Sequence, residues 1–132
     1  MHLAEELIGR YRGIRRPLPA ICLNVDCSAL TCIANDFGYD AVFARQVEAL
    51  AGPGDVVVAF STSGNSENIL AGLRAARNAG AKAIGLLGKD GGRALALCDE
   101  AFVVPHANTA RIQELHTFAL HAICETIERT FE

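Results

Sequence analysis

The pattern of apolar and polar positions is most regular near the middle of the chain. Five consecutive apolar residues, Val56–Phe60, follow a Gly-Pro-Gly turn at positions 52–54. A short run rich in β-branched residues, bounded by such a turn, is typical of a parallel strand buried on both faces. The pattern predicts that Val56–Phe60 is a central strand of a parallel sheet.

A helix is predicted directly after this strand and a short polar turn. Beyond Ser66 the chain changes to helical spacing, with apolar positions at Ile69, Leu70, Leu73 and Ala76. Ser66 is a suitable N-cap residue, and Gly80 suits the position just past the helix C-terminus.

The remaining segments continue this alternation. Further strands are predicted at Ala20–Val25, Lys82–Leu87 and Glu100–Pro105. Helices are predicted at Met1–Tyr11, Ala41–Leu50, Arg93–Cys98 and about Thr109–Arg129, while residues 28–35 fit either a short helix or an extended loop. Strands alternating with helices predict an α/β fold of three layers, with a mainly parallel sheet flanked by helices.

The turn between the central strand and its helix is rich in hydroxyl groups. It reads Ser-Thr-Ser-Gly-Asn-Ser at positions 61–66. Backbone N–H groups and hydroxyls at a helix N-terminus form a site for anions such as phosphate. The alternative is an ordinary strand–helix turn with a good cap, but one cap does not need four hydroxyls.

Composition narrows the possible classes of protein. The 132 residues suit one domain, and a hydrophobic fraction of 51% with 6% aromatic residues predicts a core of Ala, Val, Leu and Ile. A net charge of −3 argues against a nucleic-acid surface, and no apolar run reaches membrane-spanning length or resembles a secretory signal. Five cysteines without a C-x-x-C pair predict buried free thiols rather than disulfides or a thiolate zinc site.

Two residues of the first helix could act together. His2 and Glu6 are four positions apart, so their side chains share one helix face. From spacing alone, a solvated helix start with a capping carboxylate is the preferred interpretation.

Several motifs together resemble a known family. The serine-rich turn resembles the phosphosugar-binding loop of sugar isomerase (SIS) domains. Four further segments, in the same order, resemble the phosphoheptose isomerases of that group: HLAEELIGRY at 2–11, NDFGY at 35–39, KDGG at 89–92 and RIQELH at 111–116, with His121 five residues later. The resemblance covers nearly the whole chain and implies one SIS domain over residues 1–132.

The resemblance implies roles for individual residues. The acid/base pair would be Glu6 and His121, and the phosphate would be held by Ser61, Thr62, Ser63 and Ser66. Further substrate contacts are implied at Asn35, Asp36, Arg10 and Gln113. The same resemblance implies a zinc ion bound by His2, Glu6, Gln113 and His121. Gln113 and His121 are eight residues apart, about 12 Å along a helix axis, so both reach one ligand only with extended side chains or with help from a second subunit.

The implied reaction converts sedoheptulose 7-phosphate to D-glycero-D-manno-heptose 7-phosphate, towards ADP-heptose or GDP-heptose. The resemblance, together with the long apolar final helix, implies a homotetramer with sites at subunit interfaces, and the free thiols indicate a reducing cytoplasm. The first alternative is a non-catalytic scaffold similar to the DnaA initiator-associating protein, and the second is another SIS isomerase or a phosphosugar-sensing regulator. His2, Glu6 and His121 favour the enzyme, because a scaffold does not need them.

One segment of the family pattern is absent from this sequence. Relatives carry a helix, a strand and a Gly-Asn-Gly-Gly-Ser turn before the His-containing helix, whereas this sequence begins at Met1-His2. We therefore expect the sheet to lack one strand, which would leave an apolar edge.

Overall fold

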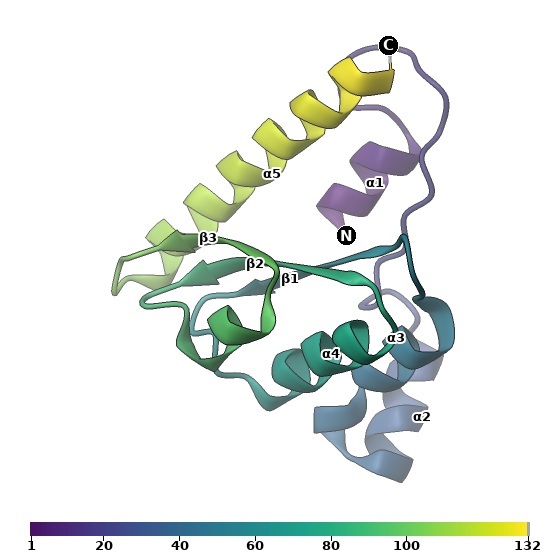
Figure 1. The fold of residues 1–132 in the computed structure, drawn as a ribbon, viewed down its shortest axis with the longest axis vertical. Helices are drawn as coiled ribbons and strands as arrows, with labels where there is room; N and C mark the ends of the chain where they lie inside the picture. The colour runs from purple at the N-terminus through teal and green to yellow at the C-terminus, as the bar shows by residue number, and fades with distance from the viewer. Residues whose placement is uncertain (132) are drawn as a thin grey trace.

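A parallel sheet of three strands forms the middle layer of the computed structural model, which describes residues 1–131. The strands are β1 (Val56–Ser61), β2 (Lys82–Gly88) and β3 (Glu100–Val104). The helices are α1 (His2–Ile8), α2 (Cys27–Phe37), α3 (Ala44–Leu50), α4 (Glu67–Asn78) and α5 (Thr109–Phe131), with 3₁₀ helices η1 (Tyr39–Ala41) and η2 (Gly92–Leu97). Figure 1 shows α1 and α5 on one side of the sheet and α2, α3 and α4 on the other. The predicted three-layer α/β fold with a parallel sheet is confirmed.

The strand pairing places the serine-rich turn beside a second turn. β1 pairs with β2 from Val56 opposite Lys82 to Ser61 opposite Leu87, and β2 pairs with β3, both in parallel. The carboxyl ends of parallel strands lie at one edge of the sheet, where ligands bind in open α/β folds. The turns after Ser61 and Gly88 therefore emerge together.

One cluster of core residues lies between the sheet and α4. Leu70, Leu73 and Leu87 are almost fully buried there and pack in one cluster with Ala59 and Ala83. Small residues let α4 approach the sheet closely, which fixes the helix N-terminus behind the serine-rich turn.

The C-terminus of α4 ends as the sequence predicts. Gly80 has a φ of +77°, and its N–H donates to the carbonyl of Arg77 while the N–H of Ala81 donates to Ala76. This is the Schellman arrangement, in which glycine supplies the left-handed residue.

Two of the strand predictions are wrong. Val56–Phe60 is not central, because β1 is an edge strand in the order β1-β2-β3 and Val56 and Phe60 are exposed. Ala20–Val25 forms no strand within the described residues. Both errors have the same physical reason. An apolar pattern indicates that a segment tends to be buried, but a strand also needs a neighbouring strand to pair with its backbone. The two segments do not pair with each other.

Helix boundaries agree more closely with the sequence. The ambiguous segment 28–35 lies within α2, which Asp26 caps by accepting a hydrogen bond from the Ala29 N–H at 2.9 Å. The expected helix Ala41–Leu50 is divided, since α3 begins only at Ala44, and Arg93–Cys98 forms the 3₁₀ helix η2. The long final helix is confirmed as α5.

Candidate active site

The serine-rich turn keeps its hydroxyl protons free for a ligand. The Oγ of Ser61 accepts a hydrogen bond from the Gly64 N–H at 3.0 Å, and that of Ser63 accepts from the Asn65 N–H at 3.2 Å. Ser66 occupies the N-cap position of α4, yet its side chain makes no capping hydrogen bond. Each hydroxyl still has a proton to donate, and capping alone does not explain why the turn contains them.

A second turn supports the first through glycine contacts. Gly64 has a φ of +63°, and a Cβ placed there would lie 1.9 Å from the carbonyl oxygen of Gly91. The carbonyl of Gly64 accepts a hydrogen bond from the Ala94 N–H at 2.9 Å, and Asn65 Oδ1 accepts from the Arg93 N–H at 3.1 Å. The serine-rich turn is therefore held in shape by the turn that follows β2.

A cluster of three titratable side chains lies between α1 and α5. His2 Nε2 is 3.0 Å from Glu6 Oε1 and 3.3 Å from His121 Nε2. One ligand atom from each of the three residues lies within 4.8 Å of the others. The spacing of His2 and Glu6 alone favoured a solvated helix start. That interpretation does not explain the arrangement, because His121, 115 residues after Glu6, joins the same cluster.

The donor set of this cluster suits a zinc ion. Two imidazole nitrogens and a carboxylate are ligands that zinc accepts, and three protein ligands leave a position for water or substrate. Glu6 is the more enclosed partner, with a side chain 14% exposed against 44% for His2. His2, Glu6 and His121 therefore fit the implied metal.

The segment after α1 is fixed to both helices. Arg15 donates to the carbonyls of Glu6 at 2.6 Å and Leu7 at 2.9 Å, which satisfies the C-terminus of α1. The buried Glu128 of α5 accepts the Arg12 N–H at 3.1 Å through both carboxylate oxygens. The pKa of Glu128 is lowered by backbone N–H groups that donate to its carboxylate. The N–H of Gly13 has the largest effect, and those of Arg12 and Tyr11 follow. These contacts hold α1 against α5, and with it the cluster.

Other predicted site residues lie away from the cluster. Gln113 lies near the start of α5, where it lines a small cavity with Ser61 and Thr62. Asn35 and Asp36 are exposed, hydrogen-bonded to each other on α2, and thus in the layer on the far side of the sheet from α1 and α5 (Figure 1). Arg10 is exposed, and its guanidinium donates to the Arg12 carbonyl.

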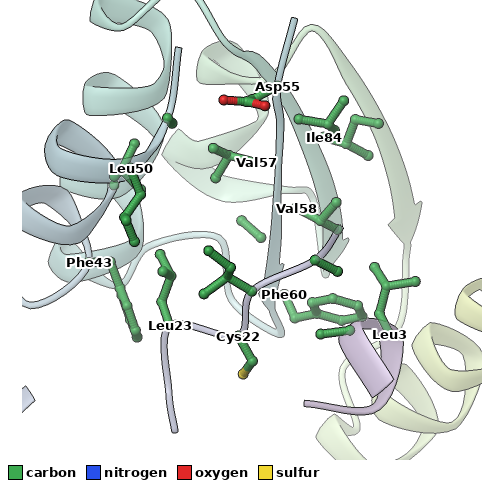
Figure 2. A pocket seen from close by; sticks show the side chains of 18 of the residues that line it. Leu3, Cys22, Leu23, Phe43, Leu50, Asp55, Val57, Val58, Phe60 and Ile84 are labelled. Atoms are coloured by element: carbon green, nitrogen blue, oxygen red, sulfur yellow. The ribbon is translucent and has the colours of Figure 1, made fainter. Parts of the chain in front are cut away.

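A second and larger cavity lies away from the cluster of His2, Glu6 and His121. It has a volume of about 980 Å³ and extends along the unpaired edge of β1. Figure 2 shows Val57, Val58 and Phe60 of β1 on one side and Cys22 and Leu23 on the other. Its wall is mostly apolar and contains none of the cluster residues, so we interpret it as the space beside an unpaired strand.

Two side chains near the predicted site were not singled out as site residues from the sequence. His116 on α5 is 5% exposed and lines the small cavity, and Tyr11 has its ring centre 5.8 Å from that of His121. The signals for His116 were its place in the RIQELH segment and on the apolar face of a helix, where histidines without a binding role also occur.

The cysteines are free, as predicted, but they are not uniformly buried. Cys27 and Cys32 are exposed and only Cys124 is fully buried, so the prediction of five buried thiols is wrong. Both exposed cysteines are on α2, and none of the residues of this helix is buried. Burial raises the pKa of the Cys124 thiol. No helix within residues 1–131 has both the length and the apolar character needed to cross a membrane.

Comparisons with known proteins agree on one family. The SIS domain family model matches residues 1–88. The chain is 56% identical to a phosphoheptose isomerase of Nitratiruptor sp., and the match covers 98% of this chain and 70% of that protein. It is 52% identical to a phosphoheptose isomerase of Helicobacter pylori, and that match covers 98% of this chain and 68% of the relative. The solved phosphoheptose isomerase from Neisseria gonorrhoeae superimposes with a TM-score of 0.89 at 44% identity, covering 97% of this chain and 68% of the other. The one from Francisella tularensis gives a TM-score of 0.93 at 36% identity, covering 97% and 69%.

Proposed function

Because the chain belongs to the phosphoheptose isomerase family of SIS-domain proteins, we propose that it interconverts an aldose and a ketose phosphate. The proposed substrate is sedoheptulose 7-phosphate and the product D-glycero-D-manno-heptose 7-phosphate, a precursor for ADP-heptose or GDP-heptose. The observation that carries the proposal is the convergence of His2, Glu6 and His121 from opposite ends of the chain.

The reaction needs a group that moves a proton between two adjacent carbons. A carboxylate and an imidazole near one another can supply a base for the carbon-bound proton and an acid/base partner for the oxygens. We assign these roles to Glu6 and His121. His2 lies within hydrogen-bonding distance of both and orients them.

The phosphate is assigned to the serine-rich turn. Ser61, Thr62, Ser63 and Ser66 offer hydroxyl donors next to the N-terminus of α4, which favours an anion. Holding the phosphate there fixes the sugar independently of the proton transfer. Asn35, Asp36 and Arg10 remain predicted substrate contacts; those from α2 would need a second subunit to reach this layer.

Zinc is the proposed metal. When bound, a divalent ion polarises the carbonyl oxygen of a sugar and stabilises negative charge on it. His2, Glu6 and His121 would hold it. Gln113, the predicted fourth ligand, lies away from these three residues in one chain and would have to come from a second subunit.

We further propose a homotetramer working in the cytoplasm. The apolar side chains of Leu115 and Phe118, one turn apart on α5, are 45% and 69% exposed, which favours burial against another subunit. The free thiols suit a reducing compartment. Light scattering should report a particle four times the mass of the chain, and Phe118→Glu should shift it to smaller species. A monomer at micromolar concentration would contradict the assembly.

The experiment for the activity follows solvent deuterium into the sugar phosphate. Glu6→Gln keeps the size of the side chain but removes the base, so exchange should fall by about 10²–10⁴-fold with little change in KM. Glu5→Gln is the matched control, because Glu5 is exposed on the same helix and takes no part in the cluster. Exchange at the rate of the unaltered protein by Glu6→Gln would remove Glu6 from the mechanism, and no exchange by the unaltered protein would contradict the function.

A further inference from the structure

A buried histidine next to the serine-rich turn has a nitrogen without a partner. His116 is 5% exposed, and among the described residues its Nε2 atom makes no hydrogen bond. A buried polar atom without a partner destabilises the folded protein, so buried nitrogens almost always have one. The missing partner is therefore expected to come from a ligand or a solvent molecule.

The surroundings of His116 identify where that partner would lie. The ring lines a cavity of about 240 Å³ together with Ser61 and Thr62, at the carboxyl end of β1, and Gln113. Gln113 precedes His116 by three residues and lies on the same face of α5. The cavity is polar on several sides and has room for more than one water-sized group.

The ring of His116 is also held in place. Phe60 packs against it edge to face, with 6.2 Å between ring centres and an interplanar angle of 71°. An aromatic neighbour in this geometry restricts rotation of the imidazole without using either nitrogen. The ring with the unpaired nitrogen is thus held in the wall of the cavity that Ser61 and Thr62 also line.

We propose that His116 is a phosphate-binding residue, whose Nε2 donates a hydrogen bond to a phosphate oxygen of the sugar phosphate held by the serine-rich turn. This inference rests on the proposed function, since it adds a residue to the same site. It extends the phosphate site from the turn to α5, so that a ligand oxygen bridges the sheet and the helix that carries His121. His116 binds and does not move a proton in the reaction.

Two variants separate this role from a structural one. His116→Gln keeps an N–H near the position of Nε2, whereas His116→Phe keeps a ring of similar size and removes the donor. Loss of a hydrogen bond to a charged group should weaken the binding of sedoheptulose 7-phosphate by about 10- to 100-fold in His116→Phe. His116→Gln should retain most of the affinity, and kcat should change little in either.

Nuclear magnetic resonance of the unaltered protein provides a readout that packing would not change. Titration with inorganic phosphate should shift the ¹⁵N resonance of His116 Nε2 and leave that of the exposed His106 in place. This measurement does not depend on either variant folding. Calorimetry with sedoheptulose 7-phosphate then gives the affinities.

The outcomes distinguish this proposal from the proposed function. If the protein binds the sugar phosphate but His116→Phe binds it equally well, or if the Nε2 resonance does not move, the proposal is overturned. Absence of binding of phosphate and sugar phosphate to the unaltered protein overturns it as well. If phosphate moves the resonance but no isomerisation occurs, the binding role of His116 stands and the proposed function fails.

Discussion

Gly64 offers the sharpest test of how the serine-rich turn is supported. Gly64→Ala puts a side chain on a residue with a φ of +63°, which costs about 1–2 kcal/mol for a residue other than glycine. The added Cβ would lie 1.9 Å from the Gly91 carbonyl oxygen, so one turn must move by more than an ångström. Such a movement breaks the hydrogen bond from Ala94 to Gly64, worth about 0.5–1.5 kcal/mol. Together these effects should lower the free energy of unfolding by about 1.5–3.5 kcal/mol.

Gly54→Ala is the matched control for this change. Gly54 also has a positive φ, of +96°, but a Cβ there would meet no atom within 4 Å. The free energy of unfolding of Gly54→Ala should therefore fall only by the cost of the positive φ, about 1–2 kcal/mol. Urea unfolding of both variants measures the difference, and binding of sedoheptulose 7-phosphate should weaken in Gly64→Ala alone. Equal losses of stability in the two variants, with unchanged ligand affinity, would refute the view that the two turns support each other.

Three other predictions follow from the core, the carboxylates and the cluster. Leu70→Ala should destabilise the fold by about 2–5 kcal/mol in urea because Leu70 is fully buried, whereas Leu50→Ala, at a half-exposed position, should cost much less. Backbone N–H groups lower the pKa of Glu128, so the stability that its carboxylate contributes is present at neutral pH and is lost as the pH falls through that lowered pKa. Glu128→Gln should therefore reduce the fall of the thermal midpoint on acidification. A midpoint that falls as steeply as in the unaltered protein would contradict this. His2→Ala should weaken zinc binding at least about tenfold in a chelator competition assay, and an unaltered affinity would exclude His2 as a ligand.

The sequence predicts best those features that depend on neighbours along the chain. The helix after Ser66, its glycine terminus at Gly80 and the long helix α5 follow from periodicity and local geometry, and the structure confirms them. The serine-rich turn could be located for the same reason, since a strand, a turn and a helix N-terminus are all local features.

The remaining features depend on contacts between distant segments. Apolar residues at Ala20–Val25 and Val56–Phe60 indicate burial, but the pattern does not say which strand lies beside which. The spacing of His2 and Glu6 predicts a shared helix face, whereas the approach of His121 required a resemblance to a family. His116 could not be singled out, because an unpaired nitrogen is visible only once its surroundings are known.

The unpaired edge of β1 has a consequence for the behaviour of the chain in concentrated solution. Val56–Phe60 is an uncharged, β-branched segment without proline, and one row of its backbone groups has no strand beside it. Segments of this kind recruit identical segments from other molecules, and repeated addition produces cross-β fibrils. Asp55, directly before the strand, is the charged residue placed to oppose such stacking, since identical charges would lie above one another at each addition. Within residues 1–131, Asp55 and the adjacent segment around Leu23 are the parts of the chain that shield this strand.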